Sequence, residues 1–334
     1  MEHLGNAQSS LVVYGDAGNK GIGLFTTRPI GSGSILFSDA LLLSLHLRGS
    51  LWILDLIKAF TTFYDDIKTK YLALKLNENT VTDEYRSDIR DCITLFPYST
   101  NQQPILSYDK ALQVVGIFLT NACPLGNNRY GIFPEYSRTN HSCRPNSSLQ
   151  YNVDHTTLYV HAMKDLKEGE EVTISYLGRF IRSCHAKRIA QLGFDCKCDS
   201  CSPLNRRISD LRRCHIENLE TSLFPYLRWV GTRQDPGAPP LDNYEAISMA
   251  REIVKLMELE GLITNLPSAY RMVAICQLGV YDKEGAKSSI RKGEYFERLH
   301  MGNLIEKKSC IREFWERFLV EKYGEVKNTD LVTE

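Results

Sequence analysis

Three cysteines fall within six residues of the segment CKCDSC, as Cys196, Cys198 and Cys201. Structural zinc sites use four thiolate or imidazole ligands in a tetrahedron, with zinc–sulfur distances of about 2.3 Å. Three thiols at this spacing are hard to reach by chance and predict a zinc site. Because four side chains would leave no coordination position for water, we expect the site to be structural.

The fourth zinc ligand must come from another part of the chain. Cys143 is the leading candidate, in the segment NHSCRPN at residues 140–146, and Cys184 and His185 compete for the same position. The other cysteines are scattered and are expected to be incidental: Cys92, Cys123, Cys214, Cys276 and Cys310.

Two further segments carry residues that suit a small polar ligand. Asn140 and His141 directly precede the cysteine of NHSCRPN, and an Asn side chain both donates and accepts hydrogen bonds. An isolated Asn-His pair would usually form only a structural turn. In GNKGIG, Gly21 and Gly23 allow a ligand to approach the main chain, although a hairpin turn explains the glycines equally well. A dinucleotide-binding loop would lead into a helix, but TTRPIGSG follows here.

Composition sets limits on what these segments can serve. The chain has 334 residues, enough for two or three compact units, and equal numbers of basic and acidic residues, 40 of each. A net charge of zero gives no bulk attraction to nucleic acid or anionic lipid. The N-terminus MEHLGNAQSS lacks the features of a signal peptide, and the most apolar run is too short to span a bilayer. We therefore expect an intracellular protein, in the nucleus or cytoplasm, whose thiols stay reduced and bind metal.

Hydrophobic periodicity divides the chain into alternating segments. Short β segments are expected over residues 11–45 and 130–177, where SSLQYNVDHTTLYVHAM is typical of a hairpin turning at Asn152 to His155. Helices are expected over residues 51–74, 83–96, 110–122 and 184–193. After the linker TRQDPGAPPLDN come four helical segments of roughly tetratricopeptide length, residues 244–262, 268–281, 283–302 and 305–324.

Three motifs in order resemble those of the SET-domain lysine methyltransferases: NHSCRPN, then GEEVTISY at residues 169–176, then FDCKCDSC at residues 194–201. The segment GNKGIGLFTTRPI is similar to the opening of that family, and the likeness is greatest to its SET and MYND domain branch. The resemblance implies an α+β fold of small β-sheets around a knot-like crossing. It also implies a division into an N-terminal part of the SET domain (1–45), a helical insertion (46–110), a C-terminal part of the SET domain (111–183), a post-SET zinc loop (184–204) and a helical, tetratricopeptide-like C-terminal domain (205–334).

By this resemblance the chain would transfer a methyl group from S-adenosylmethionine to the side-chain amine of a lysine in a protein. Tyr176 matches the catalytic tyrosine, whose hydroxyl would orient the incoming amine. The residues matching donor contacts are Lys20, Gly21, Ile22, Gly23, Asn121, Asn140, His141, Tyr176 and Phe194. Zinc (Zn²⁺) would be held by Cys143, Cys196, Cys198 and Cys201 and would keep Phe194 over the adenine ring.

The expected substrate is a lysine-containing protein segment, for example a histone tail, and we expect a monomer that binds neither a membrane nor nucleic acid directly. The chain also departs from the branch. Residues 46–110 contain only Cys92 and cannot build a MYND zinc module. Arg144 stands where Asp is common, for which we expect a local charge change at the surface, and NACPLG at residues 121–126 is looser than the usual pattern.

Other classes of function fit parts of the sequence. A non-catalytic scaffold would keep the fold and the zinc and bind partners through the C-terminal helices, and it would not bind the methyl donor. A SET-fold enzyme acting on a non-protein substrate would methylate small molecules but no protein. A zinc-ribbon nucleic-acid binder ranks last, because a ribbon needs two paired cysteine knuckles and the net charge is zero.

Overall fold

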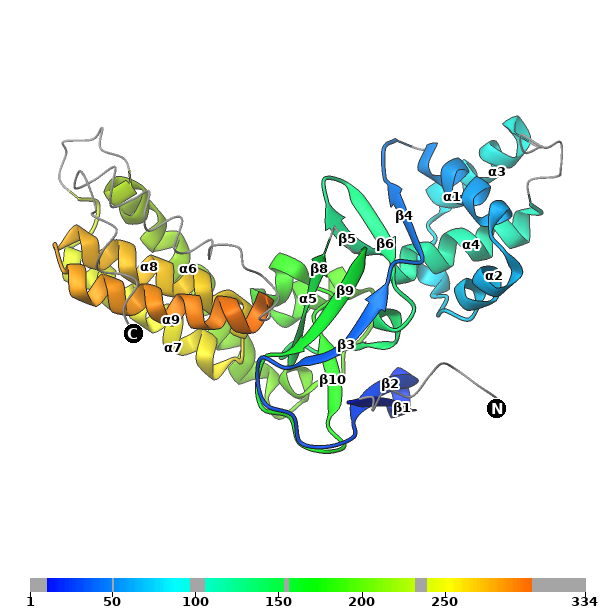
Figure 1. Ribbon diagram of the computed structural model, residues 1–334. Helices are drawn as coiled ribbons and strands as arrows, with labels where there is room; N and C mark the ends of the chain where they lie inside the picture. The colour runs from blue at the N-terminus through cyan, green and yellow to red at the C-terminus, as the bar shows by residue number, and fades with distance from the viewer. Residues whose placement is uncertain (1–10, 50, 97–105, 153–155, 232–238, 302–334) are drawn as a thin grey trace.

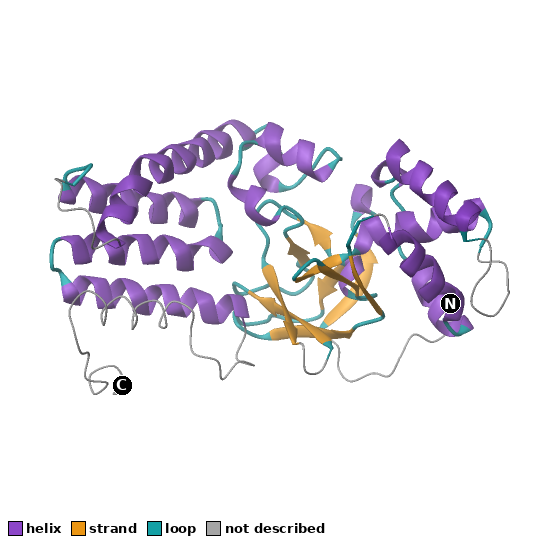
Figure 2. Ribbon diagram, turned by 90° about the horizontal axis from the view of Figure 1, so that it is seen from above, coloured by secondary structure: helices purple, strands orange, loops and turns teal. Residues whose placement is uncertain are grey.

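The computed structural model describes residues 11–49, 51–96, 106–152, 156–231 and 239–301. Small β-sheets occupy the centre, with one group of helices on either side (Figure 1). The helices within residues 51–121 lie on one side, and those within residues 206–301 lie on the other (Figure 2). None of the helices in the described ranges is both long and apolar enough to cross a membrane.

The strands form three small sheets, as predicted for an α+β fold. The four-stranded sheet has the order β1 (Val12–Asp16), β2 (Ile22–Thr26), β10 (Glu171–Ile174) and β7 (Asn140–His141). The second contains β3 (Ile35–Ala40), β9 (Thr157–Ala162) and β8 (Ser147–Asn152). The third contains β4 (Leu43–His46), β6 (Arg129–Ile132) and β5 (Cys123–Gly126). Strands β8 and β9 pair as the expected hairpin, whose turn residues 153–155 lie outside the described residues.

One strand pair brings two of the sequence motifs together in space. Strands β7 and β10 are parallel, with Thr173 opposite Asn140 and Ile174 opposite His141. The segment NHSC therefore lies beside the end of GEEVTISY, although the two are about thirty residues apart in the sequence. On its other edge β10 pairs with β2, which brings the segment after GNKGIG to the same sheet.

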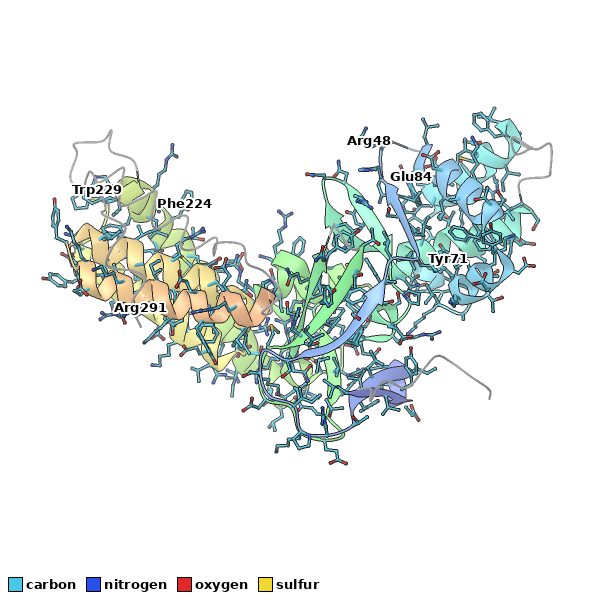
Figure 3. All side chains as sticks on the ribbon, in the orientation of Figure 1. Arg48, Tyr71, Glu84, Phe224, Trp229 and Arg291 are labelled. Atoms are coloured by element: carbon cyan, nitrogen blue, oxygen red, sulfur yellow. The ribbon has the colours of Figure 1, made fainter. Side chains whose placement is uncertain are left out.

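The helices that lie between β4 and β5 in the sequence form a small apolar core of their own. They are α1 (Leu51–Thr62), α2 (Asp65–Leu72), α3 (Asp83–Leu95) and α4 (Tyr108–Asn121). Tyr71, labelled in Figure 3, is fully buried there and donates a hydrogen bond to the carbonyl of Val114 at 2.9 Å. The single helix predicted over 51–74 is in fact two helices, because Tyr64 has an extended backbone and the chain restarts with Asp65 and Asp66 in the first turn of α2.

The C-terminal part is a layered helical array (Figure 2). The short helix α5 (His185–Leu192) matches its prediction, and it is followed by the long helix α6 (Arg206–Gly231), which periodicity did not single out. Three of the four helices expected after the linker are present as α7 (Asn243–Leu259), α8 (Leu266–Gly279) and α9 (Lys283–Met301). The fourth, at residues 305–324, lies outside the described residues, as does most of the linker. Exposed Phe224 lies on α6, away from the sheets (Figure 3).

Candidate functional site

Four cysteine thiols meet where the helical array joins the sheets. Cys143 follows β7, and the other three lie in the loop between α5 and α6, so that the ligand atoms of Cys143, Cys196, Cys198 and Cys201 all lie within 4.8 Å of one another. All four are buried, and the sulfurs of Cys143 and Cys201 are 3.6 Å apart. A zinc tetrahedron with sulfur at about 2.3 Å would place the sulfurs about 3.8 Å apart, so the thiols fit that ion. Within the described ranges, neither Cys184 nor His185 joins this group.

Buried arginines surround the thiols. Arg188 is fully buried, and its guanidinium lies 3.6 Å from the sulfur of Cys201 and 3.6 Å from the carboxylate of Asp210. Arg213 is also fully buried and donates to the carbonyl of Cys143 at 2.9 Å. Four thiolates around a divalent ion carry a net charge of −2, and a buried charge needs a partner. Arg188 and Arg213 place positive charge beside this segment, although each guanidinium also pairs with a carboxylate, that of Asp210 and that of Glu260.

The segment before Cys143 is held by an acidic residue on the neighbouring strand. The amide nitrogen Nδ2 of Asn140 donates to Glu171 Oε1 at 2.9 Å and to the carbonyl of Ile22 at 3.3 Å. The other oxygen of Glu171 lies 2.6 Å from Lys20 Nζ. Asn140, Ile22 and Lys20, predicted from separate motifs, therefore meet around Glu171.

His141 connects this segment to both the thiols and Tyr176. Burial lowers the pKa of His141 to about 4, so its ring is neutral at pH 7. Nδ1 accepts a hydrogen bond from the backbone N–H of Tyr176 at 3.1 Å, which leaves the proton on Nε2. Nε2 lies 3.3 Å from the sulfur of Cys143, to which it donates. The rings of Tyr176 and Phe194 lie 5.3 and 6.4 Å from that of His141, centroid to centroid.

Tyr176 follows the end of β10 with its ring half exposed and its hydroxyl directed inward. The hydroxyl donates to the carbonyl of Thr139 at 2.7 Å. Removal of the hydroxyl from water, and then the negative charge of Glu171, raise the pKa of Tyr176 to about 12. The phenol is therefore neutral at pH 7, and because its hydrogen is committed to Thr139, its oxygen lone pairs are available to accept a hydrogen bond.

A family model described as the SET domain matches residues 21–177. The chain contains a SET domain. Histone-lysine N-methyltransferase set5 of Schizosaccharomyces pombe is 35% identical over 106 residues, which cover 30% of this chain and 33% of the relative. Histone-lysine N-methyltransferase SMYD3 of Homo sapiens is 28% identical over 152 residues, covering 42% of this chain and 33% of the relative. The chain thus matches about a third of the length of these curated relatives.

Among solved structures, that of Rubisco LSMT bound to AdoMet aligns over 97% of this chain and 95% of the other, with 15% sequence identity and a TM-score of 0.41. A score this low supports no comparison of the two sites. The SET domain match itself ends at Leu177, after Tyr176 and before Phe194 and the cysteine loop.

Asn121, another predicted donor contact, has hydrogen-bond partners of its own. Asn121 is the last residue of α4, and its side-chain amide donates to the carbonyls of Lys75 and Ile117, both at 2.7 Å. Among the described residues it makes no hydrogen bond to the Asn140 segment. Its observed role is to close the end of α4. Gly21 has a φ of 84°, which favours glycine and supports the alternative reading of GNKGIG as a turn.

Two residues of the site carried no clear signal in the sequence. Glu171 is one of two adjacent acidic residues in GEEVTISY, and only the pairing of β10 with β2 and β7 shows that it faces Asn140 and Lys20. Thr139 contributes its backbone carbonyl, which any residue type could supply. A pattern of side-chain types therefore finds neither of them.

Proposed function

We propose that this chain is a protein-lysine N-methyltransferase that transfers a methyl group from S-adenosylmethionine to the side-chain amine of a lysine in a protein. The observation that carries the proposal is the meeting of Asn140 and His141 on β7 with Tyr176, which follows the parallel neighbouring strand β10 of a SET domain. The names of the relatives, which are histone-lysine methyltransferases, support the same reaction.

The polar residues around Glu171 fit the amino-acid end of the donor. Asn140 offers an amide oxygen that accepts no hydrogen bond from any described residue, and Lys20 offers a cation. Half-exposed Phe194 offers an aromatic face beside His141 for an adenine ring. When bound, S-adenosylmethionine supplies an electrophilic methyl group on a positively charged sulfur.

Tyr176 would position the lysine amine. Its hydroxyl hydrogen is directed to Thr139, so the oxygen is free to accept an N–H from the amine and to hold the nitrogen lone pair toward the methyl group. With a pKa of about 12 the phenol is a poor general base at pH 7. The amine must therefore lose its proton before transfer, at a cost of roughly 4–5 kcal/mol at pH 7 for an ordinary lysine pKa near 10.4.

Zinc at the four thiols would fix the loop that carries Phe194. The loop leaves α5 at Gly193, whose φ of 69° ends the helix and turns the chain toward Phe194. Three ligands then follow within eight residues of Gly193. The metal would act through position alone, since four thiols fill its coordination sphere. We infer a histone or another intracellular protein as substrate, without assigning a particular lysine.

The first test is calorimetric titration of the zinc-loaded protein with S-adenosylmethionine, followed by transfer of labelled methyl groups to a histone mixture. We expect micromolar binding by the wild-type protein and lysine-bound label. The Asn140→Ala variant should lose donor binding, because the amide contacts at this position disappear. The Tyr176→Phe variant should keep donor binding but lose transfer by about a hundredfold or more.

The outcomes separate the remaining functions. If the folded, zinc-containing protein binds no donor, the result would favour a non-catalytic scaffold. Donor binding with label only on small molecules would indicate a SET-fold enzyme with a non-protein substrate. Unchanged transfer by Tyr176→Phe would refute the role assigned to that hydroxyl.

A further inference from the structure

Glu171, the first residue of β10, contacts two predicted donor-binding residues, although no sequence motif had marked it. One carboxylate oxygen accepts from Asn140 Nδ2 at 2.9 Å, and the other pairs with Lys20 Nζ at 2.6 Å. Its side chain is 20% exposed and that of Lys20 is 27% exposed, so both are partly withdrawn from water. A carboxylate in such a position strengthens its hydrogen bonds, because charge-assisted bonds are about twice as strong as neutral ones.

The contacts of Asn140 fix which way its side-chain amide faces. Both atoms near its Nδ2, the carbonyl oxygen of Ile22 and Oε1 of Glu171, are acceptors only. If the amide were turned over, its oxygen would face two other oxygens, one of them charged. Glu171 therefore holds the amino group inward and leaves Oδ1 without a hydrogen bond from the described part of the chain.

We propose that Glu171 is a positioning residue of the methyl-donor site: it orients the Asn140 amide so that Oδ1 accepts from the ammonium group of the donor's amino-acid end, and it keeps Lys20 beside that segment. The inference rests on the proposed methyltransferase function. It adds a residue that is not itself required to touch the donor.

Gly23 on β2 gives independent support. A Cβ atom at this position would lie 2.9 Å from Asn140 Nδ2 and 3.1 Å from Glu171 Oε1, both closer than ordinary contact distances. Its φ is not in the left-handed region, so backbone conformation does not require glycine here. The absence of a side chain at Gly23 leaves room for the hydrogen bond between Asn140 and Glu171, so the residue type on β2 fits this pair.

The test compares two ligands that differ only in the amino-acid end. S-adenosylhomocysteine carries that end, whereas 5′-methylthioadenosine has a methyl group in its place, and both have an uncharged sulfur. In the Glu171→Gln variant the charge that holds Lys20 is lost, and the new amide allows that of Asn140 to turn over. We expect calorimetric affinity for S-adenosylhomocysteine to fall about tenfold, the size of loss typical for a hydrogen bond to a charged group, while affinity for 5′-methylthioadenosine stays unchanged.

Glu170→Gln is the matched control. Glu170 is the adjacent residue and also pairs with a lysine and an asparagine, Lys164 at 2.9 Å and Asn146 at 3.0 Å, outside the proposed donor site. This variant should bind both ligands like the wild type. If Glu171→Gln does not fold, Glu171→Asp keeps the charge but shortens its reach, and a selective loss for S-adenosylhomocysteine is expected there too.

If Glu171→Gln lost equal affinity for both ligands, or lost affinity for neither, the positioning role would be overturned. The proposed function would still stand as long as the wild-type protein binds the donor. A wild-type protein that binds neither ligand nor S-adenosylmethionine would overturn both.

Discussion

Asp39 on β3 carries a carboxyl group that is only 6% exposed. It accepts a hydrogen bond from the backbone N–H of Tyr136 at 2.8 Å, at the start of the short 3-10 turn Tyr136–Arg138 that leads to Thr139. Burial raises its pKa from the ordinary 3.8 to about 7, although the backbone hydrogen bonds oppose the change. Asp39 thus supports the segment whose carbonyl accepts from the Tyr176 hydroxyl, but burying this carboxyl lowers stability as the pH rises above 3.8.

The substitution Asp39→Asn should remove this pH-dependent loss of stability. Between pH 3.8 and about 7 the folded chain keeps a proton on Asp39 that the unfolded chain has lost, so a rise in pH through this window lowers the free energy of unfolding. The amide keeps an acceptor for Tyr136 without this dependence. We expect the variant to be the more stable protein at pH 8, by at most about 4 kcal/mol, with the gain vanishing near pH 4 in urea denaturation.

Asp16→Asn provides the comparison, because Asp16 also accepts from a backbone N–H, that of Gly18 at 2.8 Å, but is exposed. That substitution should leave the difference between pH 4 and pH 8 as it is in the wild type. A stability gain for Asp39→Asn that is the same at both pH values would argue against a buried, titrating carboxyl.

At the residue scale the sequence was informative where side-chain type carries the chemistry. Four cysteines at restricted spacing, and the paired Asn140 and His141, could be identified before their contacts were known. The sequence favoured Cys143 over its competitors but could not decide, since ligand choice depends on tertiary geometry. Glu171 and Asp39 were not found, because nothing local shows which acidic residue a neighbouring strand will face or bury.

The loop between α5 and α6 contains a single short 3-10 turn, Asp199–Cys201, and its thiols lie in the same apolar cluster as side chains of α6–α8. Metal ligation would therefore determine its conformation. Periodicity located helices α3–α5 and α7–α9 but did not single out α6, and the parallel pairing of β7 with β10 is a long-range contact that no local pattern encodes. The same limit explains why helix 51–74 was expected to be continuous: its apolar spacing continues through the break at Tyr64.

Removal of the metal is predicted to act on this loop and on donor binding together. The purified protein should contain one zinc ion per chain, and the Cys143→Ser variant should lose it, because one tetrahedral ligand disappears. We expect its melting temperature to fall by several degrees and its affinity for S-adenosylhomocysteine to fall with it, since Phe194 is no longer fixed. Metal analysis, thermal unfolding and calorimetry measure the three effects.

Cys214→Ser is the matched substitution, because Cys214 is exposed on α6 and takes no part in the thiol cluster. It should keep zinc, melting temperature and affinity. Full donor affinity in zinc-free Cys143→Ser would refute the link between the metal and Phe194.

On the scale of the whole molecule, a buried acidic residue joins the helical array to the SET domain. Glu260, just after α7, is fully buried and pairs with Arg144 at 3.1 Å, Arg212 at 3.2 Å and Arg213 at 3.1 Å. Arg144 also reaches Asp199 in the cysteine loop at 3.3 Å. We expected Arg144 to cause a local charge change at the surface, but its ion pairs connect NHSCRPN to two other parts of the chain.

The charges around Glu260 outweigh its burial. Burial alone would raise its pKa, but the hydrogen bond from Ser209 and the charges of Arg213 and Arg144 hold the pKa below its usual value of 4.5. A carboxyl with a lowered pKa stabilises the fold above pH 4.5, and this contribution is lost as the pH falls through the folded-state pKa. The ion pairs of Glu260 thus stabilise the folded protein at neutral pH.

Glu260→Gln should consequently loosen the join between the two parts. The substitution leaves fully buried Arg213 without its anionic partner, and breaking a buried pair in this way costs about 3–5 kcal/mol. We expect lower stability at pH 7, a smaller difference from the wild type near pH 4, and faster proteolytic cleavage between the cysteine loop and α6. The control is Glu258→Gln, near the end of α7, which removes an exposed charge and keeps an oxygen that can accept from Tyr270, now at 2.9 Å from Glu258. If both variants unfold alike at pH 7, the Glu260 network does not hold the array on the SET domain, and the apolar cluster shared by Cys143 and α6–α8 must do so alone.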